Sequence, residues 1–152
     1  MFGFANASAF FSLPNFQNIA YNAAFSGLLA IGLALVISTG GIDLSVGATL
    51  SLCSCVTGWM ISNGQATGLA IVVGLLVGAG CGVANGTLVG MLALPPVIVT
   101  FGSMALFGGI AAGITNQPIP VTFPDSLFTV GSGMVIVVGM LLLGLLGWAV
   151  LQ

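Results

Sequence analysis

The chain has 152 residues, of which 59% are hydrophobic and 1% are charged, and its net charge at pH 7 is −2. A soluble domain carries about a quarter of its residues as charged side chains, so this composition excludes a water-soluble fold and makes the lipid bilayer the solvent of the chain. Lysine, arginine and histidine are absent. Their absence excludes a P-loop nucleotide site, a histidine-based catalytic or metal centre, and a basic surface for nucleic acid. We therefore predict that the protein is not an enzyme and binds neither a cofactor nor nucleic acid.

The apolar segments predict a helical membrane protein. Residues 1–17 mix phenylalanines with polar residues and prolines, and we expect this lead segment to lie at the membrane interface. Five apolar runs follow, each close to the ~20 residues that cross the hydrocarbon layer as a helix. Because the bilayer requires backbone polar groups to be paired within the segment, we predict an all-α, polytopic bundle that forms one transmembrane domain over 1–152. The predicted transmembrane helices are 19–38, 44–61, 68–92, 97–114 and 133–151.

The link between the first two runs reads STGGIDLSVG over residues 38–47. Its two adjacent glycines let the backbone leave helical angles, and Asp43 and Ser45 are placed to cap the amides that begin the next helix. A capped helix connection and a substrate site are both consistent with this pattern, since transporters often place broken helices near their substrate path. We expect the Asp43 side chain to lie within hydrogen-bonding reach of the amide of Ser45 or Val46, away from lipid.

The third run carries glycines at every fourth position. Small residues at this spacing let membrane helices approach closely, which favours helix packing over a ligand groove. Asn85 is the one amide in the run, and at membrane depth we expect it to face protein or a water-filled path. The glycines of this stripe are Gly74, Gly78, Gly82, Gly86 and Gly90.

The segment GGIDLSVG over 40–47 resembles the signature of the membrane permease subunits of bacterial ABC importers for ribose and related monosaccharides. The agreement continues in order with Asn85-Gly86, with LPPVIVTFG over 94–102, and with NQPI over 116–119. By this resemblance the chain corresponds to the N-terminal half of such a permease, without its first helix and without the loop that docks on the ATPase. It also lacks the basic residues that the family usually carries near Gly90 and Gly108.

The resemblance implies a multi-pass protein of the bacterial inner membrane that forms part of a sugar translocation path and does no chemistry. The implied partners are a second permease subunit, cytoplasmic ATPase subunits that bind the ATP, and a periplasmic sugar-binding protein. The candidate residues for the path or the helix break are Gly40, Gly41, Asp43, Ser45, Asn85 and Thr100, with Asn22, Ser26, Ser38 and Thr39 as further hydrogen-bonding residues. Two alternatives stay open: a non-transporting membrane protein that self-associates through the glycine stripe, and a small oligomeric channel.

Overall fold

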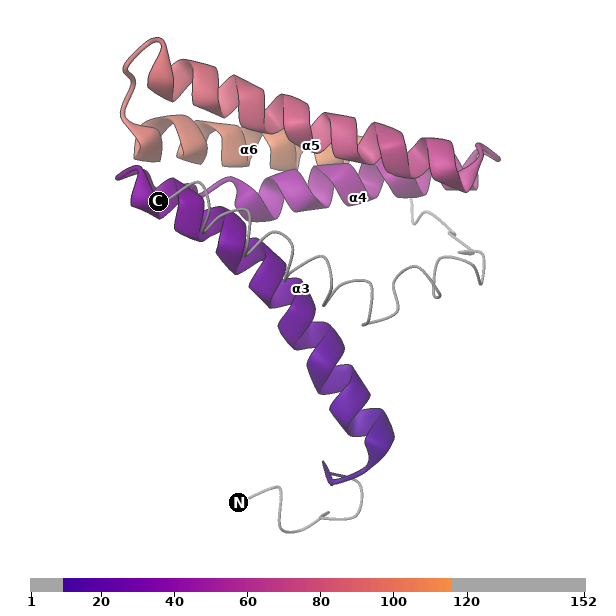
Figure 1. Cartoon of the computed structure of the whole chain (residues 1–152). Helices are drawn as coiled ribbons and strands as arrows, with labels where there is room; N and C mark the ends of the chain where they lie inside the picture. Colours follow the sequence, from indigo (N-terminus) through magenta and orange to yellow (C-terminus); the bar gives the residue numbers. More distant parts are fainter. Residues whose placement is uncertain (1–9, 116–152) are drawn as a thin grey trace. The chain divides into compact units, whose positions relative to one another are not determined.

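The computed structural model describes residues 10–115, in which every regular element is an α-helix (Figure 1). The helices are α3 (Leu13–Ser38), α4 (Val46–Ser62), α5 (Thr67–Gly90) and α6 (Pro96–Ile114). Three of them are long and apolar enough to cross a membrane, and α4 is a shorter apolar helix. These helices confirm the prediction of an all-α, polytopic membrane protein. The fifth predicted helix, 133–151, and residues 1–9 of the predicted lead segment lie outside the described residues.

Helix α3 begins at Leu13, whereas the apolar pattern predicts its start at residue 19. Residues 13–17 are therefore helical, and their expected place at the membrane interface stays a prediction. The cause is local, because Ser12 acts as the N-cap: its hydroxyl oxygen accepts a hydrogen bond from the amide of Asn15 at 3.4 Å. Pro14 then lies in the first turn, where its missing N–H has no partner to lose.

The end of α3 depends on the two adjacent glycines. Gly40 has φ +79°, which glycine adopts without steric cost. Its amide donates to the carbonyl oxygen of Ile37 at 2.9 Å, and the Gly41 amide donates to that of Val36 at 3.1 Å. This is the Schellman pattern, which pairs the last carbonyls of a helix. A Cβ on Gly41 would lie 3.2 Å from Val36 Cγ1, so the linker turns close against the helix that it leaves.

The chain divides into two units. The first contains α3 up to Leu35, and the second, Val36–Phe123, contains the end of α3 together with α4, α5 and α6. Within the second unit, α4 packs against both α5 and α6, which make fewer contacts with each other (Figure 1). Large apolar side chains such as Leu75, Val83 and Ile98 are exposed on its surface, as suits a surface that meets lipid. Its core consists of Leu52, Cys81, Phe107 and Ala111.

The glycine stripe of α5 does not face one neighbour along its whole length. A Cβ on Gly74 would overlap Thr57 Oγ1, and a Cβ on Gly78 would lie 3.1 Å from Cys53 Sγ, so these two glycines face α4. No atom of the described residues would lie within 4 Å of a Cβ on the other three, Gly82, Gly86 and Gly90. The reason is geometric, because four residues turn an α-helix by about 40° more than one full turn. Helix packing by the last three glycines stays a prediction.

Candidate functional site

The site begins in the linker before α4, where Asp43 binds Ser45 twice. Asp43 Oδ1 accepts hydrogen bonds from the amide of Ser45 and from its hydroxyl, each at 2.7 Å. The bond expected from Asp43 to the Ser45 amide is therefore present. The expected cap by the Ser45 side chain is wrong, because this residue makes no side-chain cap although it is the N-cap residue of α4. Its backbone is α-helical, at φ −85° and ψ −7°, whereas a capping side chain usually needs an extended N-cap residue.

Ser45 extends this pair to α5 and α6. Its hydroxyl oxygen accepts a hydrogen bond from Asn85 Nδ2 at 2.9 Å, and the hydroxyl of Ser103 donates to Asn85 Oδ1. We call Asp43, Ser45, Asn85 and Ser103 the hydrogen-bond chain. Ser45 is 1% exposed, and Asn85 and Ser103 are each 8% exposed. Asn85 thus faces protein, and the hydrogen-bond chain links the start of α4 to α5 and α6 through the buried side chains of Ser45, Asn85 and Ser103.

Thr100 fixes the linker from the side of α6. Its hydroxyl donates to the carbonyl oxygen of Ile42 at 3.0 Å and to that of Pro96 at 2.8 Å. The residue is 4% exposed. The bond to Ile42 spans 58 positions of sequence, so it sets the position of the linker relative to α6 and with it the position of Asp43.

A cavity of about 290 Å³ lies against this linker. Pockets that hold small ligands measure roughly 300–1,000 Å³, so this cavity suits a small solute. Glycine at two positions of α5 leaves part of its wall without side chains. The polar residues of the wall are Thr39, Asp43, Asn85 and Thr100, and the others are Val36, Gly41, Ile42, Gly82, Gly86, Val89 and Pro96.

The structure thus brings together Gly41, Asp43, Asn85 and Thr100 of the predicted site residues at the cavity wall. Gly40 forms the turn beside it, and Ser45 lies behind Asp43 in the hydrogen-bond chain. The other candidates are Asn22 and Ser26, which lie on α3 in the first unit, Ser38 at the end of α3, and Thr39 in the cavity wall.

Ser103 is a member of the hydrogen-bond chain that the sequence pattern did not identify. It lies on the buried face of α6 with Thr100 and Phe107. The available signal is its spacing, since a hydroxyl three residues after Thr100 falls on the same side of a helix. Among the described residues, no group of three or more histidine, cysteine or acidic side chains lies close enough together to hold a metal ion.

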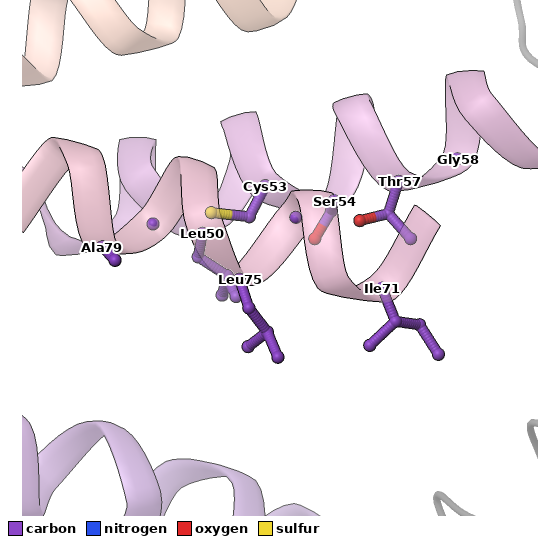
Figure 2. A pocket seen from close by; sticks show the side chains of 10 residues that line it. Leu50, Cys53, Ser54, Thr57, Gly58, Ile71, Leu75 and Ala79 are labelled. Atoms are coloured by element: carbon purple, nitrogen blue, oxygen red, sulfur yellow. The ribbon is translucent and has the colours of Figure 1, made fainter. Parts of the chain in front are cut away.

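A second, larger hollow of about 620 Å³ follows the seam between α4 and α5. Figure 2 shows its side chains, in which the Cys53 sulfur and the Thr57 hydroxyl lie on the side of α4 that meets α5. Thr57 donates a hydrogen bond to the carbonyl oxygen of Ala70 at 3.4 Å. The wall is otherwise almost wholly apolar and holds no acidic group, so it lacks the chemistry of the cavity at the linker.

Comparison with known proteins gives one family and a set of relatives. The family model described as "Branched-chain amino acid transport system / permease component" matches residues 15–152. The relatives are proteins named "Autoinducer 2 import system permease protein LsrD". The protein from Yersinia enterocolitica is 45% identical over 85 residues, which are 56% of this chain and 26% of the relative. The protein from Salmonella typhimurium is 41% identical over 109 residues, which are 65% of this chain and 33% of the relative.

A third protein of this name, from Enterobacter sp., is 39% identical over 106 residues, or 66% of this chain and 32% of the relative. The chain therefore spans between a quarter and a third of the length of these relatives. No solved structure matches the chain.

Proposed function

The chain belongs to the family of permease components of branched-chain amino acid transport systems, and from this membership we propose that it forms part of the solute path of a bacterial ABC importer for a monosaccharide. It is a multi-pass membrane protein of a transport family, not an enzyme. In this proposal the permease lies in the inner membrane and presents hydrogen-bonding groups to a solute as it crosses.

The observation that carries the proposal is the polar cavity at the end of α3. The chain is overwhelmingly apolar, yet Asp43, Asn85 and Thr100 meet at one cavity beside a break between two helices. Ionisable and polar groups at membrane depth are costly and typically belong to solute paths. Helix breaks in transporters place such groups where lipid does not reach them.

The chemistry of the cavity favours a sugar over a branched-chain amino acid. An amino acid carries a carboxylate, which is usually bound by a cationic side chain or by free amides at a helix terminus. This chain has no lysine, arginine or histidine, and the Asp43 carboxylate already occupies the start of α4. A sugar needs only hydrogen-bonding partners for its hydroxyls, which Asp43, Asn85 and Thr100 offer. The signature over 40–47, which resembles that of monosaccharide permeases, supports the same choice.

The proposed assembly contains two permease subunits, cytoplasmic ATPase subunits and a periplasmic sugar-binding protein. ATP is bound by the ATPase subunits, because this chain lacks a nucleotide site of the P-loop kind. The permease alternates between states that open to either side, driven by ATP binding to its partners. Neither a non-transporting membrane protein nor a small channel has comparable support, since the relatives are named as permeases of an import system.

The test is uptake by proteoliposomes that contain this sequence within a permease of the family that carries the ATPase-docking loop, together with the ATPase and binding protein of the same organism. We expect ATP-dependent accumulation of radiolabelled D-ribose or another monosaccharide, and none of L-leucine. Uptake of leucine without sugar would refute the sugar assignment and leave a permease. Absence of ATP-dependent uptake for sugars and amino acids alike, together with failure of the ATPase to co-purify with the permease, would refute the importer itself.

A further inference from the structure

The side-chain hydroxyls that line the cavity use their protons inside the protein. The Thr39 hydroxyl donates to the carbonyl oxygen of Val36 at 2.7 Å. The Thr100 hydroxyl donates to two carbonyl oxygens, at 2.8 and 3.0 Å. A hydroxyl has one proton and two acceptor lone pairs. Toward a solute, both threonines therefore present acceptors and not donors.

Asp43 adds a stronger acceptor to the same wall. Its Oδ1 is occupied by the two bonds from Ser45, while its Oδ2 makes no hydrogen bond within the described residues. Every fully buried side-chain oxygen or nitrogen of those residues has a partner, so Oδ2 is an accessible atom of a residue that lines the cavity. The chain has no cationic side chain to neutralise this charge. A solute that donates a hydrogen bond binds most strongly at this position, because hydrogen bonds to charged groups are stronger than those between neutral groups.

Asn85 offers a solute in the cavity only one hydrogen-bond donor. Its Oδ1 accepts from Ser103 and one of its two Nδ2 protons goes to Ser45. One N–H remains available, and it is the only side-chain proton that the cavity wall retains among the described residues. The bonds from Ser45 also hold Asp43 Oδ1 in place. The carboxylate oxygen left for a solute is therefore Oδ2.

We propose that this cavity selects solutes by the hydrogen bonds that they donate. Asp43 Oδ2 accepts a hydroxyl of an uncharged sugar and Thr100 Oγ1 accepts a neighbouring one, whereas the Asp43 charge repels anionic solutes such as sugar phosphates. This inference rests on the proposed function and deepens it by naming the specificity-determining atoms. It predicts that discrimination occurs in the permease itself, in addition to any made by a binding protein.

The variant Asp43→Asn tests the proposal by changing only the carboxylate oxygen that is assigned to the solute. The amide oxygen can keep both bonds from Ser45, while an NH₂ group replaces the free Oδ2. We expect the melting temperature in detergent to stay close to that of the wild type. Binding of D-ribose to the full chain in nanodiscs, followed by saturation-transfer NMR, should weaken about tenfold or more, as expected for a lost bond to a charged group. Ser54→Ala, an exposed hydroxyl outside this cavity, is the matched control and should bind ribose as the wild type does.

Wild-type protein provides a second test that does not depend on any variant folding. One of the two sugars 2-deoxyribose and 3-deoxyribose should lack a hydroxyl that the cavity recognises, and D-ribose should bind at least tenfold more tightly than that sugar. Ribose 5-phosphate should also bind more weakly than ribose. Equal affinity for all three sugars and the phosphate would overturn the inference, as would unchanged ribose binding by a folded Asp43→Asn protein.

Uptake separates this inference from the function on which it rests. With the binding protein saturated by ribose, Asp43→Asn should lower the uptake rate of the complete importer. An unchanged rate refutes the selection proposed for Asp43 and leaves the importer intact. Absence of uptake by the wild type, for every sugar tried, refutes the importer.

Discussion

The two halves of α5 use glycine for opposite purposes. In the first half, Gly74 and Gly78 bring the backbone against α4, where even one added carbon would meet Thr57 or Cys53. In the second half, Gly82 and Gly86 border the cavity, and an added carbon would meet nothing within 4 Å of the described residues. The same residue at the same spacing thus permits close packing in one place and leaves open space in another. The direction in which each glycine faces decides between the two.

The two halves also hold to their neighbours by different forces. The first half contacts α4 by close packing, with one long hydrogen bond from Thr57. The second half places Cys81 in the apolar core and is joined in addition through Asn85, which binds Ser45 before α4 and Ser103 on α6. A change in the first half should therefore act on stability through steric overlap. A change in the second should act through hydrogen bonds or through the cavity, and the predictions below are ordered by their expected effect on stability.

Gly74→Leu should give the largest loss of stability. Its side chain would enter the seam between α4 and α5, and overfilling of a close contact costs about 1–3 kcal/mol; we expect the upper end, because Thr57 must also give up its bond to Ala70. The three free cysteines lie on α4 and α5, so a thiol-reactive dye in a thermal ramp reports their exposure. Gly80→Leu is the control, since a Cβ there has open space. Equal melting temperatures for the two variants would show that the seam is not closely packed.

Asn85→Leu should give the next largest loss. The substitution conserves size approximately but removes both bonds of the amide, so Ser103 loses its acceptor and Ser45 loses a donor while it keeps its bond to Asp43. We expect a loss of about 1–2 kcal/mol, since interhelical hydrogen bonds in membranes contribute roughly 0.6 to 1.7 kcal/mol each. Thr87→Val is the control, because its hydroxyl bonds only the Val83 carbonyl of its own helix. A loss no greater than that of the control would mean that packing alone holds this half of α5.

The interactions that could be predicted from the sequence are those between residues close along the chain. The bond from Ser45 to Asp43 spans two positions, and the glycine pair at the end of α3 determines its own turn. The bond from Asn85 to Ser103 depends on how α5 and α6 face each other, and neither helix encodes this by itself. The stripe of glycines shows the same limit, because their spacing is visible in the sequence but their rotation relative to α4 is not.

The start of α3 differs from the start that the apolar pattern predicts, for a related reason. Ser12, Pro14 and Asn15 break the apolar pattern, and hydropathy therefore places the helix start at residue 19. Local interactions start the helix earlier, at Leu13, because Ser12 caps the helix and Pro14 fits its first turn. Hydropathy identifies the length of chain that suits the membrane, whereas capping residues determine where the helix begins.

Ala93→Gly should raise stability slightly. Ala93 follows α5 with φ +53°, a conformation that costs a non-glycine residue about 1–2 kcal/mol. Glycine removes this cost but is more flexible in the unfolded chain, by roughly 0.5–1 kcal/mol, so we expect a net gain of about 0.5 kcal/mol. Gly64→Ala is the counterpart, because Gly64 has φ +78° at the end of α4 and should lose stability. A gain for both variants, or a loss for both, would contradict this account of the two turns.

Gly82→Leu should change stability least and yet separate the two halves of α5 most clearly. Its side chain has room, because no described atom lies within 4 Å of a Cβ at this position, and we expect a change below about 0.5 kcal/mol, as for substitutions away from packed contacts. The same side chain would occupy the cavity beside Asp43 and exclude a solute from it. ATP-dependent sugar uptake by the complete importer should therefore fall to background although the variant melts at the wild-type temperature, while Gly80→Leu retains uptake.

If Gly82→Leu instead melted as early as Gly74→Leu, this part of α5 would be packed against another helix in the assembled protein. If it melted normally and transported at the wild-type rate, the solute would not pass through this cavity.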